Sequence, residues 1–381
     1  MIKTADCIII GGGVIGAAIA YNLAKKGMKN ILLFEKEYLS AGSTGRCGGG
    51  IRQQWTTEDN VKLAMRSVEL FEKFEEELGQ PFDYLQKGYL IPAFTDEQVE
   101  IFKENVEMQK RLGLDVKFIS PSEIKELAPL LNSADLLGAT FCPSDGRGNP
   151  FLTTKGYAEK AQELGVEIFT FTPVEAIKTL GTRVKSVKIR DGWIDTEIII
   201  NAAGDAAGEI GKMAGLDLPL VPYRHQILVT EPTESILDPM VIDFYHGFYG
   251  SQVKHGAFIM GEGDPNEKPG INFKSNWQFL ESIKEKFIYL FPALKDLRIV
   301  RQWSGSYTMT PDAQPIIGES EEISGFYNAV GYSGHGYMLA PASGEVIAEI
   351  IIDGKPGKIN IDHLNIKRFE DENLKTEHNV V

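Results

Sequence analysis

The chain has 381 residues, of which 43% are hydrophobic and 24% are charged, a composition typical of a folded protein with about two domains. Its formal net charge of −14 argues against nucleic acid and anionic membrane surfaces as partners. No stretch approaches the ~20 apolar residues of a membrane span.

The N-terminus enters a strand directly, so we expect no signal peptide. The three cysteines, Cys7, Cys47 and Cys142, are an odd number at unrelated spacings. We interpret them as free thiols of a cytoplasmic protein, and neither they nor the histidines show the spacing of a metal site. The prediction is therefore that the chain binds no metal.

The first predicted element is a buried strand over residues 7–10, which ends in glycines and is followed by an alanine-rich helix. This layout is typical of a dinucleotide-binding unit. Gly11 permits the tight turn, Gly13 lets the backbone approach a pyrophosphate, and Gly16 lets the helix pack closely against the strand. The N–H groups of the first helical turn, with Val14 and Ile15, point at that pyrophosphate.

A second apolar run over residues 31–34 ends in Glu35, which is followed by Lys36. An acidic residue at this distance from the glycine turn accepts hydrogen bonds from a ribose and disfavours a 2′-phosphate. NADP is therefore the least expected ligand, whereas this motif alone leaves both FAD and NAD open.

A glycine-rich loop with two arginines follows over residues 42–55. We predict that its backbone passes close to a phosphate or a flat ring, with hydroxyl groups as donors. The alternative is a flexible surface loop. The candidate cofactor-binding residues of this loop are Ser43, Thr44, Gly45, Arg46, Gly48, Gly49, Gly50 and Ile51.

Residues 85–141 change character, and we interpret them as part of a second domain inserted into the first. The α/β pattern returns from residue 155, and a strand over 198–200 runs into Asn201, Ala202, Ala203 and Gly204. A buried strand that ends in small residues before a helix is a second place where backbone can contact a cofactor. The alternative is a close-packed turn between strand and helix.

A strand-rich stretch over about 220–300 includes a predicted strand from Met240 to Tyr249. A strand over 326–330 then leads into a second glycine-rich turn, Gly331 to Met338, whose following helix is predicted from about Ser343 to Ile352. The N-terminus of that helix stabilises negative charge on a ligand. The tail from Lys367 is charged and is predicted to be frayed.

Six segments occur in a fixed order and together resemble the D-amino-acid oxidase, glycine oxidase and sarcosine oxidase family of flavoenzymes. They are IIIGGGVIGAAIAYNLAKKG, FEKE, GSTGRCGGGIRQQ, NAAG at 201–204, RQWSGSYTMTPDAQPIIG and GYSGHGYMLAPASGE. The resemblance covers essentially the whole chain. It is strongest to the branch of the sarcosine oxidase β-subunit and the dye-linked L-proline dehydrogenase β-subunit.

The resemblance implies an α/β fold with a discontinuous, Rossmann-like FAD-binding domain and an α+β substrate domain with a mostly antiparallel sheet. The FAD-binding domain would comprise residues 1–84, 145–219 and 301–366. The substrate domain would comprise 85–144 and 220–300, and residues 367–381 would form the charged C-terminal tail.

The resemblance also implies FAD in an extended pose, with its adenosine on the first glycine turn and the adenine beside Val174. The flavin would lie against the second turn, with contacts from Ala203, Gly204, Gly305, Gly331, Gly334, His335, Gly336, Tyr337 and Met338. Some relatives attach FAD through a cysteine, but Gly305 stands at the matching position, so we predict non-covalent FAD. The stretch 147–150 lacks the histidine that links FMN in sarcosine oxidase β-subunits, so covalent FMN is not expected. FMN at a subunit interface stays open.

The function that follows from this resemblance is an FAD-dependent amino acid dehydrogenase that oxidises a secondary amine, L-proline foremost, by hydride transfer to the flavin. The oxidases of the group use a lysine over the flavin to react with oxygen, and the matching strand 257–261 lacks it. Electrons would then pass to a non-oxygen acceptor or a partner subunit. Arg52 is the first candidate for the substrate carboxylate and Tyr249 the second, while His335 is a candidate for contact with the cofactor and His225 an interface residue.

Three alternatives stay open at this point. One is a sarcosine, N-methyl amino acid or glycine oxidase that produces hydrogen peroxide. Another is a flavin-binding subunit of a larger complex with catalysis elsewhere. The third is an NAD-dependent dehydrogenase, which the second glycine-rich turn disfavours.

Overall fold

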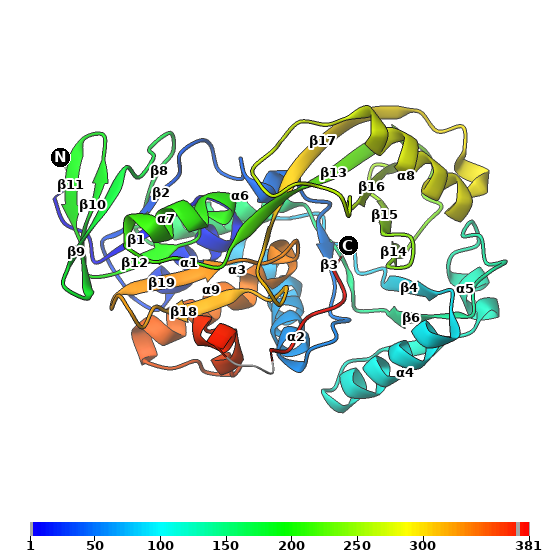
Figure 1. Cartoon of the computed structure of the whole chain (residues 1–381), viewed down its shortest axis with the longest axis horizontal. Coiled ribbons are helices and arrows are strands. Elements are labelled where there is room, and N and C mark those ends of the chain that lie inside the picture. The colour runs from blue at the N-terminus through cyan, green and yellow to red at the C-terminus, as the bar shows by residue number, and fades with distance from the viewer. Residues whose placement is uncertain (1–2, 371–373, 381) are drawn as a thin grey trace.

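The protein contains two large β-sheets that lie side by side, with the helices packed around them (Figure 1). The computed structural model describes residues 3–370 and 374–380. The first sheet has six strands in the order β18-β19-β12-β1-β2-β8. These are β1 (Cys7–Ile10), β2 (Ile31–Phe34), β8 (Glu167–Phe169), β12 (Ile199–Asn201), β18 (Ile316–Glu319) and β19 (Phe326–Val330).

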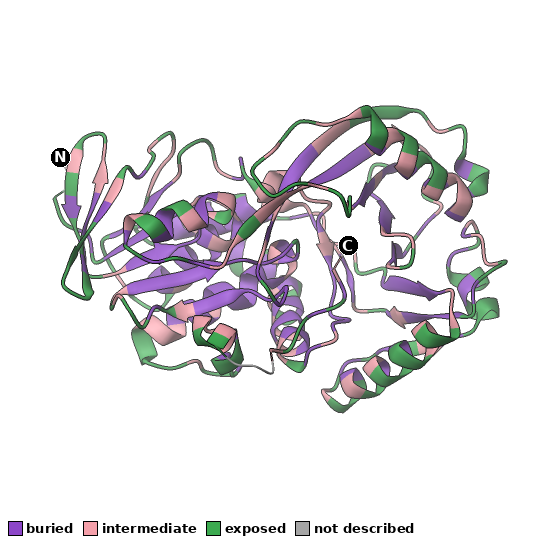
Figure 2. Cartoon of the chain, viewed as in Figure 1, coloured by how far each residue is buried: buried purple, intermediate pink, exposed green. Residues whose placement is uncertain are grey.

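Five of these strands are parallel, and only β18 runs antiparallel to its neighbour. Successive residues of a strand point to opposite faces, so Ile8 and Ile9 belong to different hydrophobic clusters. One face packs against helices, and the four inner strands, β19, β12, β1 and β2, are buried along their whole length (Figure 2). Those helices are α1 (Val14–Lys25), α2 (Glu58–Glu72), α3 (Phe74–Leu78), α6 (Pro150–Glu163) and α9 (Gly336–Asp353).

The opposite face of the six-stranded sheet is covered by a smaller antiparallel sheet and a short helix. They are β9 (Ala176–Leu180), β10 (Arg183–Ile189), β11 (Gly192–Asp195) and α7 (Ala207–Met213). The fully buried Ile8 and Ile199 pack against this layer, and so does Val187 of β10. Burial on both faces explains why β1 and β2 consist of apolar residues throughout.

The second large sheet has eight strands in the order β17-β13-β16-β15-β14-β4-β6-β5. All neighbours are antiparallel except β14 and β4. The strands are β4 (Tyr89–Ala93), β5 (Lys117–Ile119), β6 (Gly138–Cys142), β13 (Val221–Pro232), β14 (Met240–Asp243), β15 (Phe248–Gln252), β16 (Ala257–Glu262) and β17 (Ile299–Met309). The accompanying helices are α4 (Asp96–Arg111), α5 (Pro121–Leu127) and α8 (Trp277–Leu290).

The eight-stranded sheet has two different faces. Leu228, Val241 and Phe248 point into a cluster with α5 and α8. The residues next to them, Ile242 and Tyr249, point to the other face. That second face carries the side chains that the sheet contributes to the candidate site. Strands β3 (Gly50–Ile51) and β7 (Gly146–Arg147) pair to form a separate two-stranded antiparallel sheet.

The architecture agrees with the predicted α/β fold and its antiparallel second sheet, while the predicted domain boundaries stay a prediction. Strand β17 belongs to the eight-stranded sheet up to Met309, although we placed residues from 301 onward with FAD binding. The strand expected from Met240 to Tyr249 is two strands, because a turn closed by Asp243 separates them. Helix α9 begins at Gly336 and not near Ser343, since Pro341 is accommodated inside it.

The prediction of a frayed tail was wrong for residues 374–380. This segment is extended, and Glu377 and Asn379 are buried within the molecule. In Figure 1 it is the red stretch that ends at the label C, between the two large sheets. The parts of the tail at 371–373 and 381 lie outside the described residues.

Candidate functional site

A cavity of about 280 Å³ lies where the two sheets meet. Gly11, Glu35, Ala202 and Gly331 follow directly after the parallel strands β1, β2, β12 and β19, so they gather at one edge of the six-stranded sheet. All four line the cavity. This is the edge at which open α/β sheets bind ligands.

The first glycine turn has the geometry that its sequence predicts. Gly11 has φ +116°, and a Cβ there would stand 2.3 Å from the carbonyl oxygen of Ala202. A Cβ at Gly16 would stand 2.0 Å from the carbonyl oxygen of Gly11, so Gly16 serves the packing of α1 on β1. Gly13 is different, because only Thr44 Oγ1 lies near its Cβ position, at 3.0 Å. Its open side faces the cavity, as close approach of a ligand requires.

Glu35 is held at the same end of the cavity by backbone groups. Its Oε2 accepts a hydrogen bond from Gly12 N at 2.7 Å, and its Oε1 accepts one from Glu37 N at 2.8 Å. The carboxylate is therefore fixed beside the glycine turn, with lone pairs left for a ligand.

The loop after Glu35 is fixed on β17, so the alternative of a flexible surface loop is wrong. Ser43 Oγ donates to the carbonyl of Ser306 at 2.8 Å, and Arg46 Nη1 donates to that of Ser304 at 3.1 Å. Trp303 Nε1 in turn donates to the carbonyl of Arg46 at 2.9 Å. These contacts connect the loop that follows Glu35 to strand β17 of the eight-stranded sheet.

Arg52 is the buried cation of the site, with 3% of its surface exposed. Its Nη2 donates to the carbonyl of Asn379 at 2.6 Å and its Nη1 to that of Gln54 at 3.3 Å. The guanidinium lies 3.9 Å from the centre of the Trp55 ring. Burial lowers the pKa of Arg52, and no carboxylate of the described residues forms an ion pair with it. A buried guanidinium that hydrogen-bonds only to carbonyls has donors available for an anionic ligand.

Tyr249, His225 and Tyr307 form an aromatic cluster on the eight-stranded sheet. His225 Nε2 and Tyr249 Oη are 3.1 Å apart, and the His225 ring stacks on Tyr307 with 4.1 Å between centroids. Burial lowers the pKa of His225 to about 3 and raises the pKa of Tyr249. The cluster is polar but uncharged at neutral pH.

His335 is the residue that precedes α9, and its ring lies 4.6 Å from that of Trp55. Both ring nitrogens are buried, and neither has a hydrogen-bond partner among the described residues. Burial lowers the pKa of His335 to about 3, so the ring is neutral at pH 7. Buried polar atoms without a partner are rare in folded proteins, and His335 is one of the residues that line the cavity.

The structure brings nearly all the candidate site residues to this one cavity. Those that line it are Gly11, Gly13, Val14, Ile15, Glu35, Lys36, Ser43, Thr44, Arg46, Gly48, Gly49, Gly50, Arg52, Ala203, Gly204, Tyr249, Gly305, Gly331, Gly334, His335, Gly336, Tyr337 and Met338. Those that do not are Gly16, Gly45, Ile51 and Val174. Gly45 lacks space beside the carbonyl of Ser40, Ile51 is fully buried in the core, and Val174 packs in the apolar cluster of Phe34.

Several residues that line the cavity were not predicted. They include Trp55, on which the Arg52 guanidinium lies, Tyr89, and Tyr307 of the aromatic cluster. Tyr307 stands in a segment that carries the family resemblance, and Trp55 ends the glycine-rich loop at 42–55, so both had a signal in the sequence. No sequence signal pointed to Asn379 and Val380. Asn379 contacts Arg52 and Gln54, which precede it by more than 300 residues in the chain, and Val380 lines the same cavity.

The chemistry of the lining fits a flavin dinucleotide. Backbone glycines and the N-terminus of α1 lie at one end, and the N-terminus of α9 with the unpaired His335 lies at the other. In the described part of the chain, no group of three or more His, Cys, Asp or Glu is arranged to hold a metal ion, and all three cysteines are free. None of the described helices is long and apolar enough to span a membrane.

Comparison with known proteins identifies the family. The model of the FAD dependent oxidoreductase (DAO) family matches residues 6–350. The chain belongs to this family. The predicted resemblance is therefore confirmed, and the match supports FAD as the cofactor in place of NAD.

Two curated relatives and one solved structure show how far the similarity extends. Dimethylglycine dehydrogenase of Rattus norvegicus mitochondria is 31% identical over 92% of this chain, but the match spans only 43% of that protein. Sarcosine oxidase subunit beta of Arthrobacter sp. is 29% identical over 99% of this chain and 94% of its own length. The crystal structure of L-proline dehydrogenase from P. horikoshii superimposes with a TM-score of 0.93, with 40% identity over 97% of this chain and 99% of that one.

Proposed function

We propose that this protein is an FAD-dependent dehydrogenase of a secondary amino acid, with L-proline as the foremost substrate. The observation that carries this proposal is Arg52, a buried guanidinium without a carboxylate partner among the described residues, in the cavity that also contains the dinucleotide-type turn. The 40% identity to an L-proline dehydrogenase over nearly the full length of both chains supports the choice of substrate.

The residues of the cavity divide into two groups. Gly11, Gly13 and Glu35 would hold the adenosine and pyrophosphate end of FAD, and the stretch from Gly331 to Met338 would hold the flavin end. When bound, FAD supplies the acceptor for a hydride from the α-carbon of the substrate.

Three features of the chain would prepare the substrate. Arg52 binds the carboxylate and thereby fixes the orientation of the α-carbon. The pair of Tyr249 and the neutral His225 offers an uncharged hydrogen-bonding partner to the amine, which favours the neutral amine. Met240 and Ile242 are apolar and exclude water beside it. The arrangement needs no strong general base if the amine binds in its neutral form.

The lining of the cavity favours a dehydrogenase over an oxidase. Lys36, at the end with the first glycine turn, is the only lysine that lines the cavity among the described residues. The matching strand, β16, carries Ile259 and Met260 and no lysine, whereas related oxidases place a lysine over the flavin. We infer that electrons leave to an acceptor other than oxygen. A sarcosine or glycine oxidase that produces hydrogen peroxide is the alternative.

We also propose that the protein works in a complex with a partner subunit and that a second flavin, FMN, binds at their interface. A separate cavity of about 190 Å³ is lined by Lys87, Arg147 and Lys254. Both lysines pair with aspartates, but Arg147 forms no ion pair with a described residue and its buried Nε has no partner among them. Its Nη1 donates to the carbonyl of Gln252 at 3.5 Å, so the guanidinium keeps donors for an anionic group such as the phosphate of FMN. The similarity to a protein named as a subunit supports a complex, and catalysis by another subunit is the competing possibility.

Anaerobic reduction of the bound flavin tests this function. The purified yellow protein is mixed without oxygen with L-proline, sarcosine, glycine or D-proline, and the loss of flavin absorbance is followed. We expect L-proline to bleach the flavin fastest, and the reduced protein to be reoxidised faster by a redox dye than by oxygen. Fast reoxidation by oxygen with peroxide formation would support the oxidase alternative. A flavin that stays oxidised with every substrate would contradict the proposal.

A further inference from the structure

Residues 374–380 form a short extended segment that we call the C-terminal strap. Glu377 and Asn379 are 2% and 7% exposed, whereas His378 between them is exposed. This alternation places two polar side chains inside the protein. Burial of an acid and an amide is costly unless they are fully hydrogen-bonded, so their partners indicate what the strap does.

Glu377 is bound at the N-terminus of α2. Its carboxylate accepts hydrogen bonds from the backbone N and Oγ1 of Thr56 at 3.0 and 2.7 Å, and from those of Thr57 at 3.1 and 2.9 Å. Asn60 Nδ2 adds a contact at 3.2 Å. Thr57 makes no side-chain cap of its own helix, and Glu377 accepts hydrogen bonds from the two backbone N–H groups directly before that helix. Burial alone would raise the pKa of Glu377, but these hydrogen bonds lower it, so the carboxylate is ionised.

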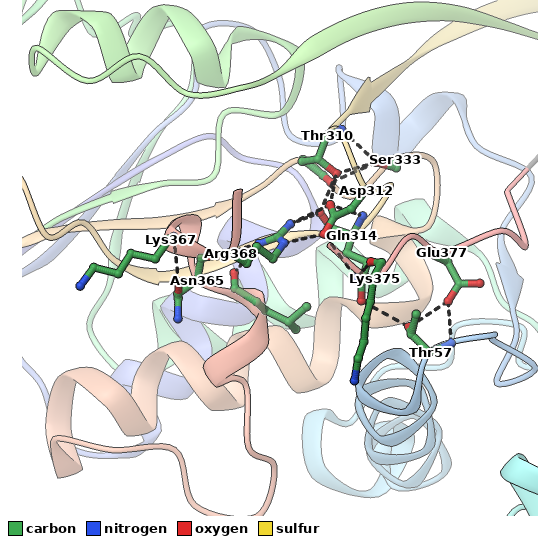
Figure 3. A network of polar contacts seen from close by, with 12 residues as sticks. Thr57, Thr310, Asp312, Gln314, Ser333, Asn365, Lys367, Arg368, Lys375 and Glu377 are labelled. Atoms are coloured by element: carbon green, nitrogen blue, oxygen red, sulfur yellow. Dashed lines mark hydrogen bonds and ion pairs between the residues drawn. The ribbon is translucent and has the colours of Figure 1, made fainter. Parts of the chain in front are cut away.

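A second set of contacts fixes the chain on either side of the undescribed residues 371–373 (Figure 3). Arg368 forms a buried bidentate ion pair with Asp312 at 2.6 and 3.1 Å. Gln314 Nε2 donates to the carbonyl of Lys375 at 2.6 Å, and Glu377 N donates to that of Asp312 at 2.9 Å. Thr310 connects the same network to Ser333 of the second glycine-rich turn.

The strap contacts the site itself through Asn379. The carbonyl of Asn379 accepts the 2.6 Å hydrogen bond from Arg52 Nη2, and its Nδ2 donates to the carbonyl of Gln54 at 3.1 Å. Asn379 and Val380 also line the cavity. Of the two hydrogen bonds that hold the guanidinium, the shorter one therefore comes from the strap.

We propose that the C-terminal strap completes the substrate pocket, with Glu377 as a positioning residue that acts through Asn379 on Arg52. This inference rests on one part of the proposed function, namely that Arg52 binds the carboxylate of the substrate. With Glu377 in place, the Asn379 carbonyl orients the guanidinium and the strap closes one wall of the cavity. Without it, Arg52 loses its shortest contact, and carboxylate binding weakens more than the chemical step does.

The test measures binding of pyrrole-2-carboxylate, an aromatic analogue of L-proline that has no α-hydrogen to lose. Its dissociation constant is read from the change in flavin absorbance of the FAD-loaded protein. We expect Glu377→Ala to weaken binding about tenfold or more with an unchanged FAD content, and Glu377→Gln, which keeps one acceptor oxygen, to fall in between. The matched control is His378→Ala, whose exposed side chain leaves binding within about twofold of the unmodified protein.

Kinetics with L-proline supply the second readout, in which KM rises for Glu377→Ala by more than kcat falls. If Glu377→Ala does not fold, Asn379→Ala replaces it and is expected to weaken binding about threefold. Unchanged affinity for the analogue in a folded Glu377→Ala protein of lower thermal stability would overturn the inference, because the strap would then be only structural. If L-proline fails to reduce the flavin but the analogue still binds and Glu377→Ala weakens that binding, the proposed substrate fails and the strap inference stands.

Discussion

The two ends of the cavity are built in different ways. The end at which we propose the adenosine of FAD uses Gly11, Gly13 and Glu35, which are close in sequence and lie beside backbone N–H groups. The end at which we propose the substrate combines side chains from distant segments, among them Arg52, Tyr249 and Asn379. A site made of backbone depends on glycines and helix ends, whereas a site made of side chains depends on tertiary packing to bring them together. The two ends should therefore fail differently when they are mutated.

The largest effect is expected at the adenosine end, for Gly13→Leu. A Cβ at this position meets only Thr44 Oγ1 within 4 Å, and the rest of the side chain would fill the space through which we propose that the pyrophosphate approaches. We expect FAD binding to weaken at least about 100-fold while the apoprotein stays folded. FAD content by absorbance and folding by circular dichroism check this. Gly208→Leu in α7, where a Cβ meets nothing within 4 Å, is the matched control and should stay yellow.

At the substrate end, Arg52→Lys should leave FAD in place and impair substrate binding. Lysine keeps the charge but loses the planar fork and the contacts to two carbonyls. We expect KM for L-proline to rise about 30-fold with a smaller change in kcat. Arg66→Lys, which disturbs an ion pair with Glu345 away from the cavity, is the control. A colourless Arg52→Lys protein would mean that Arg52 is also needed for FAD binding, and it would contradict the assignment of the two ends to different ligands.

Tyr249→Phe is expected to have a smaller effect at the same end. The substitution removes the hydroxyl that pairs with His225 at 3.1 Å but keeps the ring and its packing. Oxidation of L-proline should slow about fivefold in kcat/KM, and FAD content should not change. Steady-state kinetics with a redox dye measure this, and an unchanged kcat/KM would remove Tyr249 from the list of residues that contact substrate.

The last prediction concerns stability and pH and also belongs to the substrate end. The pKa of folded His225 is about 3, below its ordinary 6.5, so the unfolded chain binds more protons between these values. The free energy of unfolding is therefore highest above pH 6.5 and falls by up to ~1.4 kcal/mol per pH unit below it for this residue. His225→Gln should reduce the fall seen between about pH 7 and about pH 5.5 in urea unfolding by ~1.4 kcal/mol. The control is His255→Gln, an exposed position at which the substitution should leave this fall in the free energy of unfolding unchanged.

The difference between the two ends of the cavity also explains which parts of the site could be predicted from the sequence. The roles of Gly11, Gly16 and Glu35 follow from local geometry, because each acts on residues of its own strand-turn-helix unit or on the next strand. The second glycine-rich turn was also visible in the sequence, and the family resemblance added its contact with the flavin. Val174 was placed at the adenine by resemblance alone, and in the structure its side chain lies in the apolar cluster of Phe34.

The strap was beyond prediction for a physical reason. A charged tail with few apolar residues has no pattern that distinguishes a solvated end from a buried one. Glu377 is buried only because Thr56, Thr57 and Asn60 provide hydrogen bonds at a helix N-terminus more than 300 residues away in the chain. Such a contact is visible only once the fold has brought the two segments together.

The most direct test of the account is a crystal structure of the FAD-loaded protein with pyrrole-2-carboxylate. The account predicts both ligands in the one cavity, with the adenosine of FAD at Gly13 and Glu35 and the carboxylate of the analogue on Arg52 beside the strap. A carboxylate bound away from Arg52, or an adenosine away from the first glycine turn, would contradict it.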